Sequence, residues 1–166
     1  MEKLLIFLMI LASSFILWAK DIEIFVMDRG YRTVQYALEH AVHDATLQVD
    51  IEEASAGRIK FLESNAETAL LNTIQKNIPV DSLLRPTSNL LEGPLRIKEI
   101  IYMDHDYIDP ETSLSISFPA VWSHTLEDGT EFTRPIFGPS IVLIVDVDVK
   151  GGGGYTPFIV IQEYKI

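Results

Sequence analysis

The sequence predicts an α+β protein in which an N-terminal transmembrane or stalk helix and a second helix precede an antiparallel β-sheet that packs on the helices. Three observations lead to this fold class. The chain opens with an apolar run, continues with apolar residues at helical spacing, and changes after Pro94 to segments in which apolar and polar residues alternate. We find no internal repeat, so we expect an anchor and juxtamembrane helix over residues 1–29 and a single extramembrane domain over residues 30–166.

The composition excludes several classes of protein. The 166 residues include 13 Lys and Arg against 24 Asp and Glu, for a net charge of -11, and there is no cysteine. A disulfide scaffold, a thiolate zinc site and a cysteine nucleophile are therefore ruled out. The acidic balance argues against a nucleic-acid partner, which needs clustered Lys and Arg, and against electrostatic attachment to anionic lipid.

The N-terminal apolar run has the composition of a membrane anchor. It extends from Leu4 to Trp18 and is interrupted only at Ser13 and Ser14. A helix that crosses a bilayer needs about 20 apolar residues. Trp18 and Lys20 can lengthen this short run, because Trp favours the membrane interface and Lys can extend its amine to it. We therefore expect an uncleaved, single-pass anchor in the cell membrane, with lipid as its partner.

A cleaved signal peptide is the alternative for the same run. A cut after Ala19 would place Leu17 where such peptides carry a small residue, and this favours the uncleaved anchor. The distribution of basic residues leaves the orientation open. Lys3 on one side is opposed by three basic residues between positions 20 and 32, and these alternate with acidic ones.

An amphipathic helix continues directly from the anchor. Its apolar face consists of Val34, Ala37, Leu38, Ala41, Val42 and Ala45. No helix breaker lies between Glu2 and Gly30, and a helix that runs from Lys3 to Val49 would be about 70 Å long. Gly30 is the expected position of a kink.

The small residues on this face are candidates for helix packing. A stripe of alanines at four-residue spacing lets another helix or a sheet approach closely. The candidate residues are Val34, Ala37, Leu38, Ala41 and Ala45. Two partners remain open for this stripe: the sheet and helix of the chain's own domain, which is the favoured one, or a helix of another subunit.

The second helix is expected from Gly57 or Arg58 to Asn77, where Ile78-Pro79 ends it. Strands are expected over residues 94–103, 113–124, 132–137, 139–150 and 157–165. Pro119 makes the second of these an edge strand or a strand with a break, and Glu127-Asp128-Gly129-Thr130 is typical of a hairpin turn.

The fourth strand has the clearest pattern. One of its faces is apolar throughout and should be buried; it consists of Ile141, Leu143, Val145, Val147 and Val149. The four glycines that follow, Gly151 to Gly154, lack the pattern of a phosphate-binding loop and should form a flexible turn.

Residues that could support chemistry are few. Asp104, His105 and Asp106 resemble a metal cluster, but consecutive side chains on an extended segment point in different directions, which favours a solvated turn. Asp109 and Glu111 extend this acidic loop without the spacing of a calcium site. His40 and His43, and the pair Asp146 and Asp148, are interpreted as surface residues. We therefore expect no metal, no cofactor and no catalytic activity.

The N-terminal third resembles a known family. Residues 28–45 read DRGYRTVQYALEHAVHDA and follow a single apolar segment. This arrangement is similar to the TadE/TadF-type pilin-like proteins of tight-adherence and related secretion systems. The chain lacks both the glycine that precedes the apolar run of type IV prepilins and their early glutamate. The resemblance implies an extracytoplasmic domain and related pilin-like subunits as partners.

Three functions from different classes fit these observations. The first is a membrane-anchored, pilin-like structural or assembly protein of a surface filament or secretion apparatus. The second is a membrane-tethered extracytoplasmic binding module that recognises its ligand with a β-sheet edge at residues 113–124. The third is an anchored hydrolase or metalloenzyme that uses Asp104, His105, Asp106 or Asp146. The lack of converging polar groups favours the first.

Overall fold

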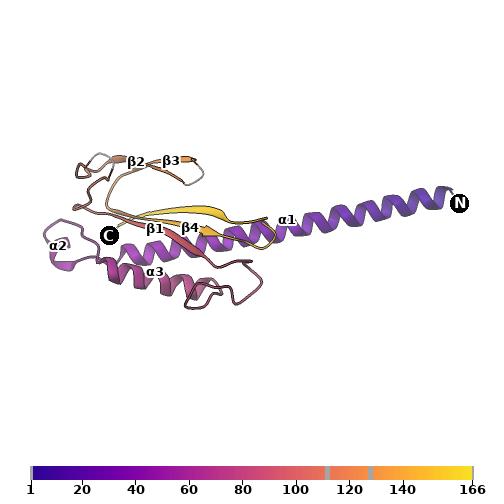
Figure 1. Ribbon diagram of the computed structural model, residues 1–166, viewed down its shortest axis with the longest axis horizontal. Coiled ribbons are helices and arrows are strands. Elements are labelled where there is room, and N and C mark those ends of the chain that lie inside the picture. Colours follow the sequence, from indigo (N-terminus) through magenta and orange to yellow (C-terminus); the bar gives the residue numbers. More distant parts are fainter. Residues whose placement is uncertain (1, 111–112, 127–128, 166) are drawn as a thin grey trace.

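A single helix, α1 (Glu2–Thr46), runs through the whole length of the molecule (Figure 1). The structure is a computed structural model that describes residues 2–110, 113–126 and 129–165. The first half of α1 projects from the rest of the chain, and its second half packs inside a head formed by all other elements. The prediction of one helix from the anchor into the domain is therefore confirmed.

The helix is continuous through Gly30. The glycine permits close packing, because a Cβ atom at this position would lie only 2.7 Å from Cγ1 of Val149. The neighbouring Tyr31 stacks on Phe158, with ring centroids 6.0 Å apart, and its hydroxyl lies 3.1 Å from Oγ1 of Thr156. These contacts fix the point at which the stalk enters the head.

The predicted second helix is shorter than expected, and a separate short helix precedes it. The short α2 (Ile51–Ser55) is capped by Asp50, whose Oδ1 accepts hydrogen bonds from two backbone N–H groups. The chain then returns in extended form, and α3 (Glu63–Asn77) begins later than expected. Its end is as predicted, because Ile78 is already extended before Pro79.

The strands form two antiparallel sheets rather than one. The main sheet has the order β1-β4-β5 and consists of β1 (Arg96–Met103), β4 (Ser140–Val147) and β5 (Thr156–Glu163). A separate hairpin pairs β2 (Ala120–Thr125) with β3 (Glu131–Ile136). The expected strand over residues 113–124 thus begins only at Ala120. Of the predicted hairpin turn, residues 127 and 128 lie outside the described part of the chain.

The central strand β4 is buried on both faces, which gives the head three layers. Its face predicted to be buried packs toward α1 and α3, and this prediction is confirmed. The opposite face, through Val142 and Ile144, is covered by Trp122 and Ile136 of the hairpin and by Met103 of β1. This second, smaller core was not predicted from the sequence. Figure 1 shows the β2–β3 hairpin as a separate layer beyond the main sheet.

We predict that Ala41→Leu destabilises the head. Ala41 is fully buried between α1 and the other elements of the core, and added methylene groups in a packed core cost about 1–3 kcal/mol of unfolding free energy. Denaturant unfolding of the full chain in detergent measures the change. Tyr36→Leu is the matched control, since Tyr36 lies on the same helix but is 61% exposed; equal stability of the Ala41→Leu variant and wild type would contradict the packing described here.

Candidate functional site

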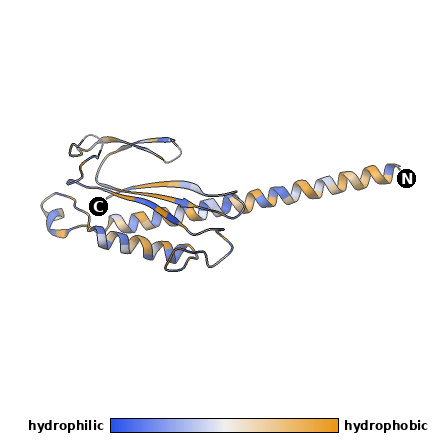
Figure 2. Cartoon of the chain, viewed as in Figure 1, coloured by the Kyte–Doolittle hydropathy of each residue, from blue (hydrophilic) through white to orange (hydrophobic). Residues whose placement is uncertain are grey.

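The projecting half of α1 is the most unusual surface of the molecule. The large apolar side chains exposed between Leu4 and Val26 each keep between 44% and 66% of their surface accessible. This part of the helix is strongly apolar (Figure 2), and none of it is buried against the head. The helix is therefore long and apolar enough to cross a membrane.

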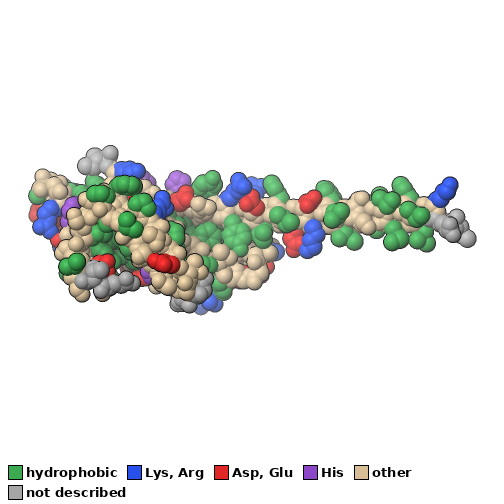
Figure 3. Space-filling view, turned by 90° about the horizontal axis from the view of Figure 1, so that it is seen from above, with side chains coloured by type: hydrophobic (Ala, Val, Ile, Leu, Met, Phe, Trp, Pro, Cys, Tyr) green, Lys and Arg blue, Asp and Glu red, His purple; other side chains and the backbone are tan. Residues whose placement is uncertain are grey.

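Two ion pairs within α1 accompany the apolar surface. Lys20 Nζ lies 2.8 Å from Glu23 Oε2, and Arg32 Nε lies 3.0 Å from Asp28 Oδ2. Pairing reduces the cost of bringing four charges close to a bilayer surface, because each charge keeps a partner where water is depleted. The helix is again apolar at Ile22, Ile24, Phe25 and Val26. Figure 3 shows that the charged side chains of the stalk lie at its tip and on the part next to the head, with apolar side chains between them.

The predicted helix-packing residues lie inside the head. Val34, Leu38, Ala41 and Ala45 are fully buried and Ala37 is 3% exposed, all in one core with β4 and α3. Of the two partners left open for this stripe, the structure places the chain's own sheet and helix there. A neighbouring subunit cannot reach these five side chains while the head stays folded.

The segment that resembles a metal cluster joins two loops. Its side chains at positions 104–106 bond to residues 58–61, and we call this contact the clamp. Asp104 is buried, and its Oδ2 accepts a hydrogen bond from the backbone N–H of Phe61 at 3.1 Å. His105 meets the backbone of Ile59 through Nδ1 at 2.9 Å from the amide nitrogen. Asp106 pairs with Arg58 and with Lys60. Each side chain reaches a different point of residues 58–61, so the three do not converge on one position.

Charge and burial shift the pKa values of two groups at or near this clamp. The hydrogen bond from Lys60, assisted by the charges of Arg58 and Lys60, holds the pKa of the Asp106 carboxyl below its usual range. Burial, followed by the charges of Glu67 and Glu63, raises the pKa of Tyr102 to about 12. Tyr102 therefore stays protonated, and its hydroxyl donates to the carbonyl of Glu63 at 3.4 Å.

The remaining candidates are separated in the fold. His40 and His43 are exposed on α1, while the neighbouring Asp44 accepts a hydrogen bond from Oγ1 of Thr73 on α3 at 2.6 Å. Asp146 is paired with Lys98 at 3.5 Å. Among the described residues, no group of three or more His, Asp or Glu side chains could hold a metal ion. Glu111 of the acidic loop lies outside the described residues.

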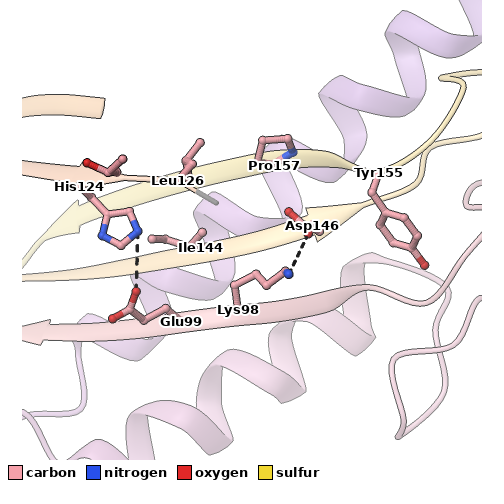
Figure 4. A pocket seen from close by; sticks show the side chains of 9 residues that line it. Lys98, Glu99, His124, Leu126, Ile144, Asp146, Tyr155 and Pro157 are labelled. Carbon is pink, nitrogen blue, oxygen red and sulfur yellow. Dashed lines mark ion pairs between the residues drawn. The ribbon is translucent and has the colours of Figure 1, made fainter. Parts of the chain in front are cut away.

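A cleft that the sequence did not reveal lies between the hairpin and the main sheet (Figure 4). Its volume is about 480 Å³. Two ion pairs cross its floor: Lys98 with Asp146, and His124 Nε2 with Glu99 Oε2 at 3.8 Å. The lining residues are Lys98, Glu99, His124, Thr125, Leu126, Ile144, Asp146, Tyr155 and Pro157.

A β-bulge explains why two consecutive residues share this cleft. The register between β1 and β4 shifts between Ile97 and Glu99, so Lys98 and Glu99 both reach the lining, whereas regular alternation would send them to opposite faces. His124 is held by stacking on Trp122, with ring centroids 5.5 Å apart. The charged groups in the cleft thus already have partners within the described chain.

Comparison of the chain with protein-family models, with curated proteins and with solved structures finds no match. The fold and the exposed helix are therefore the observations on which a function can be argued.

We predict that Asp104→Ala lowers the free energy of unfolding by about 1–3 kcal/mol, the cost of leaving buried backbone donors without an acceptor. The lost acceptor serves the amide of Phe61 and, through Oδ1, that of Asp106. Asp104→Asn keeps one oxygen and should recover part of the loss. Denaturant unfolding is the measurement. If a chelator lowered the unfolding free energy of the wild-type protein by the same amount, that result would contradict the clamp and restore the metal interpretation.

We predict that Asp106→Asn destabilises the protein near neutral pH and not in strong acid. The pKa of Asp106 is lowered in the folded state, so its contribution is present above the carboxyl group's ordinary pKa and is lost as pH falls through the lowered value. Thermal unfolding of wild type and variant over a pH series measures this. Two melting curves that stay equally far apart at every pH would show that the charge of Asp106 is not responsible.

Proposed function

We propose that the chain is a membrane-anchored, pilin-like structural or assembly protein of a surface filament or secretion apparatus, with no catalytic activity. The observation that carries this proposal is the continuity of α1. One helix exposes apolar side chains over its first half and, over its second half, buries one apolar face between Val34 and Ala45 in the head.

Such a helix does more than tether a domain. A flexible linker would suffice to keep a binding domain near a membrane. Here five fully or nearly fully buried side chains, together with the contacts of Gly30 and Tyr31, fix the direction of the stalk relative to the head. A rigid connection of this kind suits a subunit whose head must keep a set position with respect to neighbouring anchored subunits.

The resemblance of residues 28–45 to TadE/TadF-type pilin-like proteins agrees with this proposal. The poor cleavage pattern after Ala19 favours an anchor that stays uncleaved in the cell membrane. The resemblance implies that the head lies on the extracytoplasmic side and that the partners are copies of this chain or related pilin-like subunits. The exposed apolar surface from Leu4 to Val26 supports the membrane part of the proposal.

A tethered binding module is the second candidate. The cleft between the hairpin and the main sheet favours it, since it combines apolar walls with paired charges. Within the segment predicted to bind a ligand, residues 113–124, the side chain of Val121 on β2 is exposed. A binding module of this kind would act as a monomer in the membrane, whereas an assembly protein would not.

We predict that the head is accessible from outside the cell. Because the chain has no cysteine, Thr87→Cys in an exposed loop of the head provides a single site for a membrane-impermeant maleimide. This variant should react in intact cells, and Leu8→Cys in the anchor should react only after detergent is added. The protein extracted from membranes should have the mass of the uncleaved chain.

Labelling of Thr87→Cys only after lysis would reverse the proposed orientation. Recovery of a soluble chain that begins at Lys20 would overturn the anchor itself. A chain that is exclusively monomeric in membranes would favour the binding module over the assembly protein.

A further inference from the structure

The face of α1 that points away from the head has no partner within the described chain. Its large residues follow a strict alternation of three- and four-residue steps, the spacing of a coiled-coil seam. The seam consists of Leu4, Leu8, Leu11, Phe15, Trp18, Ile22, Phe25, Arg29, Arg32 and Tyr36. The apolar members are all between 44% and 66% exposed, and Tyr36 continues the seam alongside the head.

Two charges on or beside this seam are unpaired. Asp21 precedes the seam residue Ile22, and Arg29 lies on the seam itself; both are exposed. Their charged neighbours Lys20, Glu23, Asp28 and Arg32 are all engaged in ion pairs within the helix. Neither Asp21 nor Arg29 forms an ion pair or side-chain hydrogen bond with any residue in the described ranges.

The two opposite charges are complementary to each other on separate copies. They are eight residues apart, which is slightly more than two helical turns, so they cannot meet within one helix. Copies anchored in the same membrane must be parallel. If two such copies packed in register, Asp21 would lie near Asp21 and Arg29 near Arg29, and like charges would repel.

We propose that the seam binds a second copy of this chain, displaced along the helix by about two turns, roughly 11 Å, so that Arg29 of one copy pairs with Asp21 of the next. This inference rests on the proposed function and specifies its interface. The displaced copy presents its own Arg29 beyond the contact, so the pairing can repeat. Each repeat displaces the next copy by about another 11 Å along the helix axis, and successive anchors therefore move out of the bilayer as the assembly grows. Such a head-to-tail contact generates an open assembly rather than a closed dimer.

The aromatic seam residues fit the same arrangement. After a displacement of two turns, Arg29 of one copy lies beside Trp18, Ile22 and Phe25 of the neighbour, where a guanidinium group can stack on aromatic rings. The second apolar stretch of the stalk, Ile22 to Val26, is then covered by a neighbouring helix. This explains why apolar residues continue beyond the ion pair of Lys20 and Glu23.

Cysteine crosslinking in membranes tests the register directly, because the wild-type chain has no cysteine. Phe25 and Thr33 lie one turn beyond Asp21 and Arg29 respectively, and both are exposed. A Phe25→Cys copy should crosslink to a Thr33→Cys copy several-fold more than two Phe25→Cys copies crosslink to each other. Equal or greater crosslinking of the 25–25 pair would overturn the displaced register.

Charge reversal then tests the proposed pair. Asp21→Arg and Arg29→Asp should each reduce the 25–33 crosslink by roughly fivefold, and the double variant Asp21→Arg/Arg29→Asp should restore it. Glu52→Arg is the control for Asp21→Arg, because it changes the net charge equally but lies on α2, away from the stalk, and it should leave the crosslink unchanged.

The possible failures are distinct. Crosslinks that survive both single reversals, or that the double variant does not restore, would overturn the Asp21–Arg29 pairing while leaving an assembly protein in place. A wild-type chain that is monomeric in membranes and forms neither crosslink would overturn both this inference and the proposed function.

Discussion

The packing of α1 on α3 and the main sheet is the contact on which the rest of the molecule depends. Val34, Ala37, Leu38, Ala41 and Ala45 share one core with α3 and the inward face of β4, and this core has almost no exposed apolar surface. Small side chains at three of these positions let the helix approach the sheet closely, and Gly30 lets Val149 approach the helix at the edge of the head. Because this contact fixes the direction of α1, it also fixes where the apolar stalk and its unpaired charges point.

Local patterns in the sequence were sufficient to predict most of the fold. The continuous helix, the end of α3 at Pro79 and the buried face of β4 each follow from the spacing of apolar residues or from a proline. The second layer of strands could not be predicted in this way. Whether Val142 and Ile144 face solvent or another layer depends on where β2 and β3 pack. The spacing of apolar residues within β4 does not show whether a hairpin elsewhere in the chain covers that face.

The candidate site was only partly predictable for a related reason. The exposed anchor is a property of composition and could be identified directly, whereas the alanine stripe has the same spacing whether it packs on its own sheet or on another subunit. Asp104, His105 and Asp106 have the residue types of a metal site, yet their partners are backbone groups and basic residues at positions 58–61, more than 40 residues away in the sequence. The cleft beside Lys98 and Glu99 depends on a β-bulge that alternation does not predict.

The central claim is that one rigid helix couples the bilayer to the head, and the distance between two spin labels on α1 tests it most directly. With labels at Leu11→Cys and Tyr36→Cys in liposomes, diluted with unlabelled protein, 25 helical residues separate the sites. Our account predicts a single narrow distribution centred on a backbone separation of about 38 Å. A broad distribution that extends to clearly shorter distances would reveal a hinge between bilayer and head and would contradict the account.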